Sequence, residues 1–371
     1  MTTSIAMTVD GLRDMLERHE PVTIVDVRPA AERAEWAIPG SMHVDAYDKL
    51  RNDDPEALAG LTLPASAPVV TVCAAGRTSL IAALQLRARG VEARSLSGGM
   101  KAWSLSWNHA EIPLPTSMTE VVQVRRTGKG CLSYLIGSQG EAAVLDASLP
   151  AQVYLQLAQR YGWAIAHVFD THVHADHLTR ARALAELTGA TLYLPDQQRV
   201  SYPFTPLRDG DIVDIGDATI RVLATPGHTP ESTSYQLDRQ ALFTGDTLFL
   251  AGVGRPDLEA SPEQARERAH TLYASLQRLM SLPAETLVLP GHTSTPVAFD
   301  REPVFATLAE VVERVELLHA DEEHFVTLIL GRIPPTPPNH HLIVRLNEAG
   351  LALEPMDAIE LEAGANRCAV S

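Results

Sequence analysis

Four side chains able to bind a metal ion lie within seven residues of the sequence, in THVHADH at 171–177. His172 and His174 are two residues apart, so their side chains can point to the same side of an extended loop. Asp176 and His177 follow directly. Imidazole nitrogens and carboxylate oxygens together suit Zn²⁺, Fe²⁺ or Mn²⁺. The segment therefore predicts a metal site rather than a group of surface histidines.

Three further polar residues stand at the ends of apolar segments. His228 lies in ATPGHTPES, Asp246 in FTGDTLF and His292 in VLPGHTS. Each is a single polar residue at the end of a predicted strand, where side chains from different strands can converge. With THVHADH they predict one metal centre, built from widely separated parts of the chain.

Composition narrows the class of protein and its partners. A length of 371 residues predicts two domains. The formal net charge of −16 argues against nucleic acid as a partner, because phosphate binding requires clustered Lys and Arg. Hydrophobic residues make up 45% of the chain, yet no apolar run approaches the roughly 20 residues that span a bilayer. We therefore expect a globular protein without a membrane partner.

The cysteine count and the N-terminus indicate the compartment. Cys73, Cys131 and Cys368 are too few for a disulfide framework. The first twenty residues carry acidic side chains and no apolar signal segment. We expect a protein of the reducing cytoplasm. The sequence leaves the oligomeric state open, with a homodimer as one candidate.

The first 105 residues predict a small α/β domain. The apolar runs 21–27 and 67–73 are typical of buried strands, 78–90 of an amphipathic helix that ends at a glycine, and 91–96 of another strand. Such alternation predicts a parallel sheet covered by helices.

The rest of the chain predicts a linker and a second domain. Residues 106–120 are polar, contain prolines and show no clear period, so we interpret them as a linker. From 121 to 371 we expect the metal domain with a C-terminal extension. Residues 121–147 predict strands joined by glycine turns, and 331–341 predict a proline-rich turn in that extension.

The ordered set of HxHxDH, a GH histidine, a GD aspartate and a last histidine resembles the metallo-β-lactamase superfamily, and its glyoxalase II-like members in particular. The resemblance covers about 121–330. It implies an αββα sandwich with the metal at one edge of two sheets. In glyoxalase II-like hydrolases these residues hold two zinc ions, and a metal-bound hydroxide attacks a thioester. One metal would bind His172, His174 and His228, and the other Asp176, His177 and His292, with Asp246 bridging.

A second branch, the persulfide dioxygenases, has the same residues but binds one Fe(II) per chain. There the ligands correspond to His172, His228 and Asp246. Two histidines and one carboxylate leave positions open for O₂. The other members of the set would orient ligands or move protons; they are His174, Asp176, His177 and His292. The ligand set alone leaves both branches open.

Other segments favour the dioxygenase. FTGDTLFLAGVGRPDLE, GKGCLSYLIG and the C-terminal LILGRIPPTPPNHHLIVRLNEAG resemble stretches of that family. Arg255 could bind a substrate carboxylate through its two-pronged guanidinium, or form an ion pair with Asp257. We interpret Cys131 as a packed strand residue near the pocket and Cys368 as incidental. Arg125, Arg126 and Lys129 are interpreted as a solvated charge run.

Cys73 ends a predicted strand and precedes a short loop and a helix. Backbone N–H groups of such a loop, with the helix N-terminus, favour a thiolate or persulfide anion. The surroundings resemble a rhodanese domain over nearly all of residues 5–105, in IVDVRPAAERAEWAIPGSMHV and ARSLSGGMKAW. The usual loop arginine of that family falls at Thr78, and Arg77, one place earlier, is the candidate anion partner.

The two resemblances together imply a bifunctional sulfur enzyme. We expect iron-dependent oxidation of glutathione persulfide, or of another low-molecular-weight persulfide, by O₂ to sulfite and thiol. Rhodanese transfer of sulfur through Cys73 would accompany it, and sulfite or thiosulfate could pass between the sites. The alternatives are a dinuclear zinc thioester hydrolase with a rhodanese domain, and a persulfide sensor that signals from Cys73.

Overall fold

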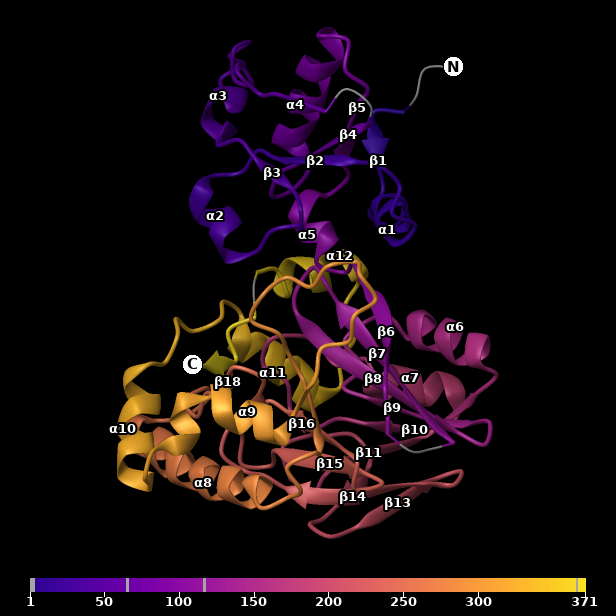
Figure 1. Cartoon of the computed structure of the whole chain (residues 1–371), viewed down its shortest axis with the longest axis vertical. Helices are drawn as coiled ribbons and strands as arrows, with labels where there is room; N and C mark the ends of the chain where they lie inside the picture. The colour runs from indigo at the N-terminus through magenta and orange to yellow at the C-terminus, as the bar shows by residue number, and fades with distance from the viewer. Residues whose placement is uncertain (1–3, 65–66, 116–117, 365) are drawn as a thin grey trace.

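The computed structural model describes residues 4–64, 67–115, 118–364 and 366–371. The chain forms two domains placed end to end along the long axis of the molecule (Figure 1). Residues 116 and 117, inside the predicted linker, lie outside the described residues. In the described part of the chain, no helix has the length and apolar character needed to cross a bilayer.

The first domain is built on a parallel sheet. Within its described residues five strands pair in the order β1-β5-β4-β2-β3, and all neighbours are parallel. β2 and β4 are buried along their whole length, as expected for strands covered by helices on both faces. The strands are β1 (Ala6–Met7), β2 (Thr23–Asp26), β3 (Met42–His43), β4 (Val69–Val72) and β5 (Ala93–Leu96). The helices are α1 (Val9–Glu17), α2 (Ala30–Glu35), α3 (Tyr47–Arg51), α4 (Arg77–Ala88) and α5 (Gly99–Trp103).

Glycines hold the loop after β4 in its tight shape. Gly76, directly before α4, has a φ of 83°, which glycine adopts without steric cost. Gly99, at the start of α5, lies so close that an added Cβ would be 2.2 Å from the carbonyl oxygen of Cys73. The paired glycines at 98 and 99 therefore let α5 pack directly on the Cys73 loop.

The second domain contains two large sheets that face one another. In its described residues, one sheet has seven strands in the order β12-β11-β10-β9-β8-β7-β6 and the other six in the order β13-β14-β15-β16-β19-β20. The first sheet contains β6 (Asn108–Ile112), β7 (Thr119–Arg126), β8 (Cys131–Ser138), β9 (Glu141–Leu145), β10 (Ala164–Phe169), β11 (Thr191–Pro195) and β12 (Thr205–Leu207). The second contains β13 (Ile212–Ile215), β14 (Ala218–Ala224), β15 (Thr233–Leu237), β16 (Ala241–Gly245), β19 (Leu287–Pro290) and β20 (Ala306–Thr307).

Helices cover the outer face of each sheet. One apolar core, which includes Tyr134, Phe169 and Phe243, fills the space between the sheets. A second lies between the seven-stranded sheet and α6 (Ala151–Tyr161) with α7 (Ala181–Thr188). A third lies between the other sheet and its helices, which are α8 (Pro262–Met280), α9 (Leu308–Arg314), η1 (Glu316–His319) and α10 (Glu322–Gly331). The layers confirm the predicted αββα sandwich after a parallel α/β domain.

The predicted linker is partly wrong. Residues 108–112 within it form β6, which pairs antiparallel with β7 at the edge of the seven-stranded sheet, and its last two residues already belong to β7. Asn108, Ala110 and Ile112 are buried and the two residues between them are less so, which is the alternation of an edge strand. This strand has only five residues and stands among polar residues and prolines, so its alternation was too short to be recognised as a strand in the sequence.

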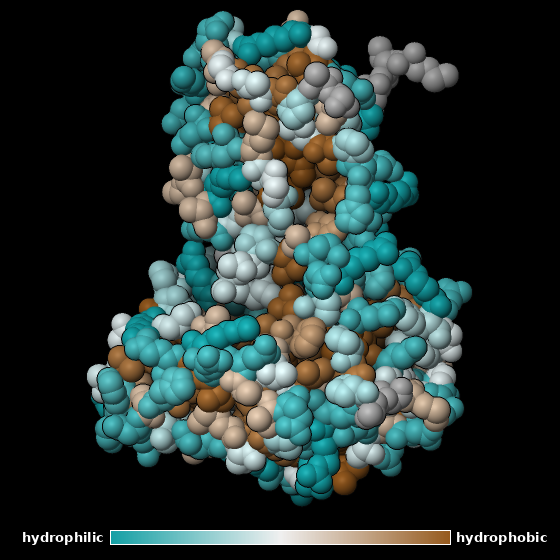
Figure 2. All heavy atoms as spheres, viewed as in Figure 1, coloured by the Kyte–Doolittle hydropathy of each residue, from teal (hydrophilic) through white to brown (hydrophobic). Residues whose placement is uncertain are grey.

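The two domains meet in a close interface. Trp36 donates its Nε1 hydrogen to the carbonyl of Thr127 at 3.0 Å. Gly128 leaves no room for a side chain, since an added Cβ would lie 1.9 Å from the carbonyl oxygen of Trp103. Apolar side chains are visible at the waist where the domains join (Figure 2). This contact gives the first domain a fixed place above the second.

The C-terminal extension returns to the metal domain and to the interface. It contains α11 (His340–Ala349), α12 (Pro355–Leu361) and β21 (Ala369–Val370). β21 pairs antiparallel with β18 (Gly252–Gly254), and β18 with β17 (Leu248–Phe249). Figure 1 shows α12 next to α5 of the first domain. The extension thus connects both domains.

Candidate metal centre and sulfur-carrying loop

The predicted metal-binding residues gather at one edge of the two sheets. THVHADH follows β10, His228 follows β14, Asp246 follows β16 and His292 follows β19. All are buried. Strand ends place each side chain on a loop that a rigid sheet supports, as binding sites commonly require.

His172, His228 and Asp246 form one compact group. Asp246 Oδ2 lies 3.6 Å from His228 Nε2 and 3.9 Å from His172 Nε2. The two imidazole rings meet edge to face, with centroids 5.0 Å apart. Neither His172 Nε2 nor Asp246 Oδ2 has a hydrogen-bond partner, although both atoms are buried. Buried polar atoms without a partner are costly, so their convergence fits a bound cation.

The other nitrogen of each imidazole is fixed by the protein. His228 Nδ1 donates to the carbonyl of Arg255 at 2.8 Å. His172 Nδ1 lies 2.9 Å from the hydroxyl of Thr171, which itself donates to Asp146 and therefore accepts from the histidine. Both histidines thus carry their hydrogen on Nδ1 and present a lone pair at Nε2, the arrangement of metal-binding histidines.

The pKa shifts of this group favour the protonation states that bind a cation. Burial lowers the pKa of His172 and of His228, so both imidazoles are neutral. Burial would raise the pKa of Asp246, but the neighbouring His292 and the two other histidines hold it below its ordinary value. Two neutral imidazoles and one carboxylate are the donor set expected for a divalent first-row metal. The residues therefore fit one ion.

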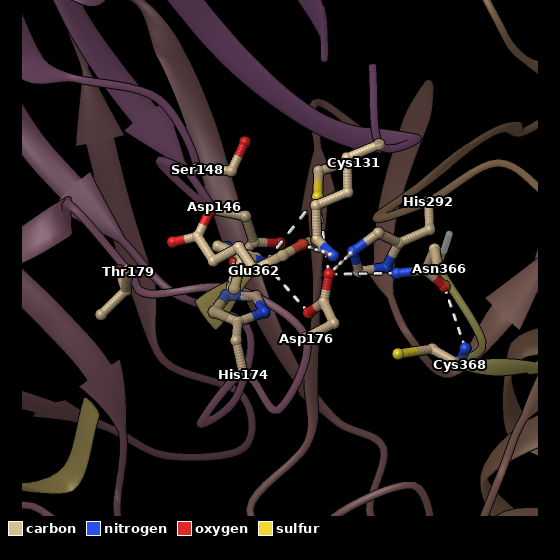
Figure 3. A network of polar contacts seen from close by, with 12 residues as sticks. Cys131, Asp146, Ser148, His174, Asp176, Thr179, His292, Glu362, Asn366 and Cys368 are labelled. Atoms are coloured by element: carbon tan, nitrogen blue, oxygen red, sulfur yellow. Dashed lines mark hydrogen bonds and ion pairs between the residues drawn. The ribbon is translucent and has the colours of Figure 1, made fainter. Parts of the chain in front are cut away.

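Asp176, His177 and His292 form a second group, in which Asp176 contacts each of the two histidines. Figure 3 shows Asp176 beside His292. His292 Nε2 is 3.0 Å from Asp176 Oδ2, and His292 Nδ1 is 2.6 Å from Asp246 Oδ1. Because both partners are carboxylates, His292 donates from both nitrogens, and the two carboxylates raise its pKa against the effect of burial. His177 Nδ1 lies 2.9 Å from Asp176 Oδ1, and Cys131 Sγ lies 3.5 Å from Asp176 Oδ2.

His174 lies between the two groups. Its ring centroid is 4.3 Å from those of both His172 and His177. Its Nε2 is 3.2 Å from Asp146 Oδ1, and Asp170 lies further along the same side. These carboxylates raise the pKa of His174 although burial opposes them. The structure therefore places His174 in an ion-pair cluster beside the group of His172.

Three residues of the C-terminal extension complete the centre, and sequence reasoning missed them. Asn347 Nδ2 donates to the carbonyls of His174 and His177 at 2.8 and 2.9 Å. Asn366 Nδ2 donates to Asp176 Oδ2 at 3.0 Å (Figure 3). Cys368, interpreted as incidental, is buried, and its sulfur lies within 4.8 Å of ligand atoms of Asp246 and His292. None belongs to a local motif that marks a metal centre.

Cys73 lies at the end of β4, and the loop before α4 surrounds its sulfur. The Gly76 N–H donates to Cys73 Sγ at 3.2 Å, and Ser79 Oγ lies 3.3 Å from the same sulfur. The backbone donor is the feature that the sequence predicted for this loop. Arg77 stands at the first position of α4 with an exposed side chain, while Thr78 is buried. Ser79, not Arg77, supplies the side-chain contact to the sulfur.

Comparison with known proteins identifies both domains. The model of the rhodanese-like domain matches residues 8–106, and that of the metallo-beta-lactamase superfamily matches residues 126–292. A hydroxyacylglutathione hydrolase from Methylococcus capsulatus is 37% identical over 206 residues, which are 54% of this chain and 77% of the relative. The chain belongs to the metallo-beta-lactamase superfamily. Its N-terminal part is a rhodanese-like domain.

Two solved structures resemble this metallo-beta-lactamase domain. The crystal structure of ETHE1 from Myxococcus xanthus has a TM-score of 0.55 and 34% identity, and covers 62% of this chain and 97% of its own. A metallo-beta-lactamase from Staphylococcus aureus has a TM-score of 0.59 and 27% identity, and covers 64% of this chain and 74% of its own. The match to ETHE1 thus spans nearly the whole ETHE1 chain.

Arg255 contacts the group of His172, His228 and Asp246 through its backbone carbonyl, which accepts a hydrogen bond from His228. Its guanidinium makes two bonds of 2.8 Å to the carboxylate of Asp257, and Nη1 donates to the carbonyls of Pro335 and Arg367. The side chain is fully buried. This geometry favours the ion-pair alternative over the predicted substrate clamp. Since the Arg255 carbonyl accepts the bond from His228 Nδ1, the ion pair positions a predicted metal ligand.

We expect Asp257→Asn to weaken metal binding by about 10- to 100-fold, the usual effect of losing a group that orients a ligand. The amide cannot make the charged two-pronged contact, so the Arg255 carbonyl and His228 Nδ1 lose their fixed alignment. The affinity for a divalent metal ion, measured by competition with a chromophoric chelator, checks this. Asp321→Asn, which changes an exposed helix cap on α10, is the control. Equal affinity in the wild type and Asp257→Asn would contradict the positioning role.

Proposed function

We propose that this protein is an iron-dependent persulfide dioxygenase joined to a rhodanese sulfurtransferase domain. Its metallo-beta-lactamase domain would convert a low-molecular-weight persulfide, O₂ and water into sulfite and the free thiol. Glutathione persulfide is the proposed substrate, because the sequence resembles persulfide dioxygenases and a relative of this domain is named for a glutathione thioester.

One observation carries this proposal: the two groups of predicted ligands differ in what they can offer a metal. His172, His228 and Asp246 converge with free lone pairs. In the other group both ring nitrogens of His292 contact carboxylates, so a second ion would have to displace one of these contacts, whereas Nε2 of His172 has no partner to displace. One ion held by two histidines and a carboxylate is the arrangement of non-haem Fe(II) oxygenases.

Each residue of the centre has a defined task in this reaction. Fe(II), when bound, supplies the redox chemistry that O₂ and the persulfide sulfur require. The Arg255 carbonyl and Thr171 orient the two imidazoles. His292, paired with Asp176 and Asp246, holds a proton next to the ligand carboxylate. Phe249 and Leu250 provide part of the apolar lining of the neighbouring pocket.

The rhodanese-like domain is proposed to carry sulfane sulfur as a persulfide of Cys73. The Gly76 N–H and the Ser79 hydroxyl lie where they could stabilise the extra negative charge of the thiolate or persulfide. A sulfur carrier next to a persulfide-oxidising centre would let both sites share the same small sulfur compounds at high local concentration.

A dinuclear zinc hydrolase of thioesters is the second candidate, and the name of the 37% identical relative favours it. That reaction needs the second group to hold a metal. One ring nitrogen of His292 would then have to give up its proton and its carboxylate contact. About a quarter of the relative's length also has no match in this chain.

Oxygen uptake tests the proposal directly. Protein prepared without oxygen and loaded with Fe(II) is given glutathione persulfide, and O₂ consumption and sulfite formation are followed together. We expect one iron per chain and one sulfite per O₂ consumed. The zinc-loaded protein, tested with hydroxyacylglutathione, is the matched comparison. Stoichiometric iron without oxygen uptake, together with thioester hydrolysis by a two-zinc form, would replace the dioxygenase by the hydrolase.

A further inference from the structure

A pocket of about 330 Å³ lies beside the metal centre. His292 and Asn366 are part of its wall, and both contact Asp176, so the pocket reaches the second group of ligands. Most of its lining is apolar, with Phe249 and Val304 as examples. The volume suits a small organic ligand. His292 also contacts Asp246 of the first group, so the pocket lies one residue away from the predicted iron site and has room for the body of the carrier thiol.

Arg367 is the one residue with a permanently charged side chain among the described residues that line this pocket. It follows Asn366 directly in the tail. Its own carbonyl accepts a bond from Arg255, which anchors its backbone to the wall of the metal centre. Its side chain is about one quarter exposed, so solvent and small ligands can reach the guanidinium.

The partner of Arg367 belongs to the other domain. Nη2 of Arg367 lies 3.3 Å from Oε1 of Glu35, the last residue of α2. The Glu35 side chain is 55% exposed. Exposed ion pairs of this kind contribute little stability. A second carboxylate that approaches through the pocket can therefore replace Glu35 at modest cost.

We propose that Arg367 binds a carboxylate of the thiol that carries the persulfide sulfur, in exchange for Glu35. The inference rests on the proposed function for the class of substrate. A guanidinium recognises a carboxylate through paired, charge-assisted hydrogen bonds, whereas an uncharged thiol offers it nothing comparable. Arg255, predicted for this task, is buried and bound to Asp257.

The exchange also links the two domains. Glu35 lines a second cavity, of about 180 Å³, together with Trp36 and Ala74, the residue after Cys73. The Glu35–Arg367 pair thus joins the walls of the two cavities. When a substrate carboxylate takes Arg367, Glu35 is left without its cation at the cavity next to the sulfur-carrying loop. Occupancy of the metal-domain pocket would in this way change the charge that an anion meets near Cys73.

The test compares a charged with an uncharged carrier. With glutathione persulfide we expect Arg367→Gln to raise KM by about tenfold, the loss of one charged hydrogen-bonded contact, with kcat nearly unchanged. Glu35→Gln should lower KM, because it removes the competing carboxylate. Neither change should affect KM for the persulfide of 2-mercaptoethanol, which has no carboxylate. Arg314→Gln, an exposed arginine on α9, is the control.

Two further measurements separate this inference from the proposed function. In the double variant the effect of Glu35→Gln should vanish, because its target is absent. Calorimetric binding of glutathione itself needs no turnover: weaker binding to Arg367→Gln supports the carboxylate site even if the protein consumes no oxygen. Binding of glutathione that is equal in the wild type and Arg367→Gln, with iron content intact in both, overturns it. An equal rise of KM for both persulfides would overturn it as well.

Discussion

Replacing His228 by Ala is expected to remove most of the bound iron and to reduce oxygen uptake by more than about 100-fold, the upper range seen when only an outer partner of a ligand is lost. His228 offers a free lone pair at Nε2 and is oriented by the Arg255 carbonyl at 2.8 Å. Without it, His172 and Asp246 provide only two donors, and the ligand set for Fe(II) is incomplete. Iron content by mass spectrometry and O₂ consumption are measured on the same sample.

Two control variants separate loss of the predicted metal site from nonspecific effects of a substitution. His319→Ala changes an exposed histidine in η1 and should leave both iron and oxygen uptake unchanged. Cys73→Ser should abolish sulfur transfer from thiosulfate to a thiol acceptor while oxygen uptake with added persulfide remains. If His228→Ala kept its iron and its activity, the group of His172, His228 and Asp246 would not be the metal site.

The convergence of the predicted ligands could be foreseen because each of these residues has a local signature. His172, His228 and Asp246 each follow an apolar strand within a short run of glycine, proline or polar residues. A polar residue that directly follows an apolar strand lies at the edge of the sheet, and this position depends only on the local sequence. The same locality made β2, β4 and α4 predictable.

The supporting residues could not be predicted in this way. Asn347 and Asn366 bond to groups 170 to 190 positions away, and neither stands in a pattern that marks such a contact. Arg126 illustrates the opposite error. The sequence predicted a solvated basic run, but this guanidinium is fully buried, because Glu362, brought in by the C-terminal extension, pairs with it at 2.7 Å. Burial of a charge depends on its partner, and the partner here is 236 residues further along the chain.

Glu362→Gln is expected to lower the free energy of unfolding of the metal domain by roughly 3–5 kcal/mol, the usual result of removing one partner of a buried ion pair. Glu362 is fully buried and contacts Arg126 at 2.7 Å and Arg180 at 2.6 Å. It also accepts the N–H of Leu178, next to His177 of the predicted metal-binding loop, at 3.0 Å. The glutamine would leave two guanidinium charges without their anion.

The pH dependence has a defined sign. Burial alone would raise the pKa of Glu362, but Arg126 and Arg180 lower it to about 2. A carboxyl whose pKa falls on folding stabilises the native state above its ordinary pKa of 4.5 and loses that contribution as the pH falls towards 2. The gap in stability between wild type and Glu362→Gln should therefore be full at neutral pH and narrow below about pH 4.5.

Urea unfolding and hydrogen exchange together measure this effect. A two-domain chain need not unfold in one step, so exchange at the amide of Leu178 locates the loss in the loop that Glu362 holds. Glu316→Gln removes an exposed partner of Arg332 and should leave the urea midpoint near that of the wild type. If Glu362→Gln changed neither the urea midpoint nor the exchange rate of the Leu178 amide, the ion pairs of Glu362 would not stabilise the packing of the C-terminal extension on the metal domain. Faster exchange together with weaker iron binding would place Glu362 among the groups that hold the metal-binding loop, although it contacts no predicted ligand of the His172 group.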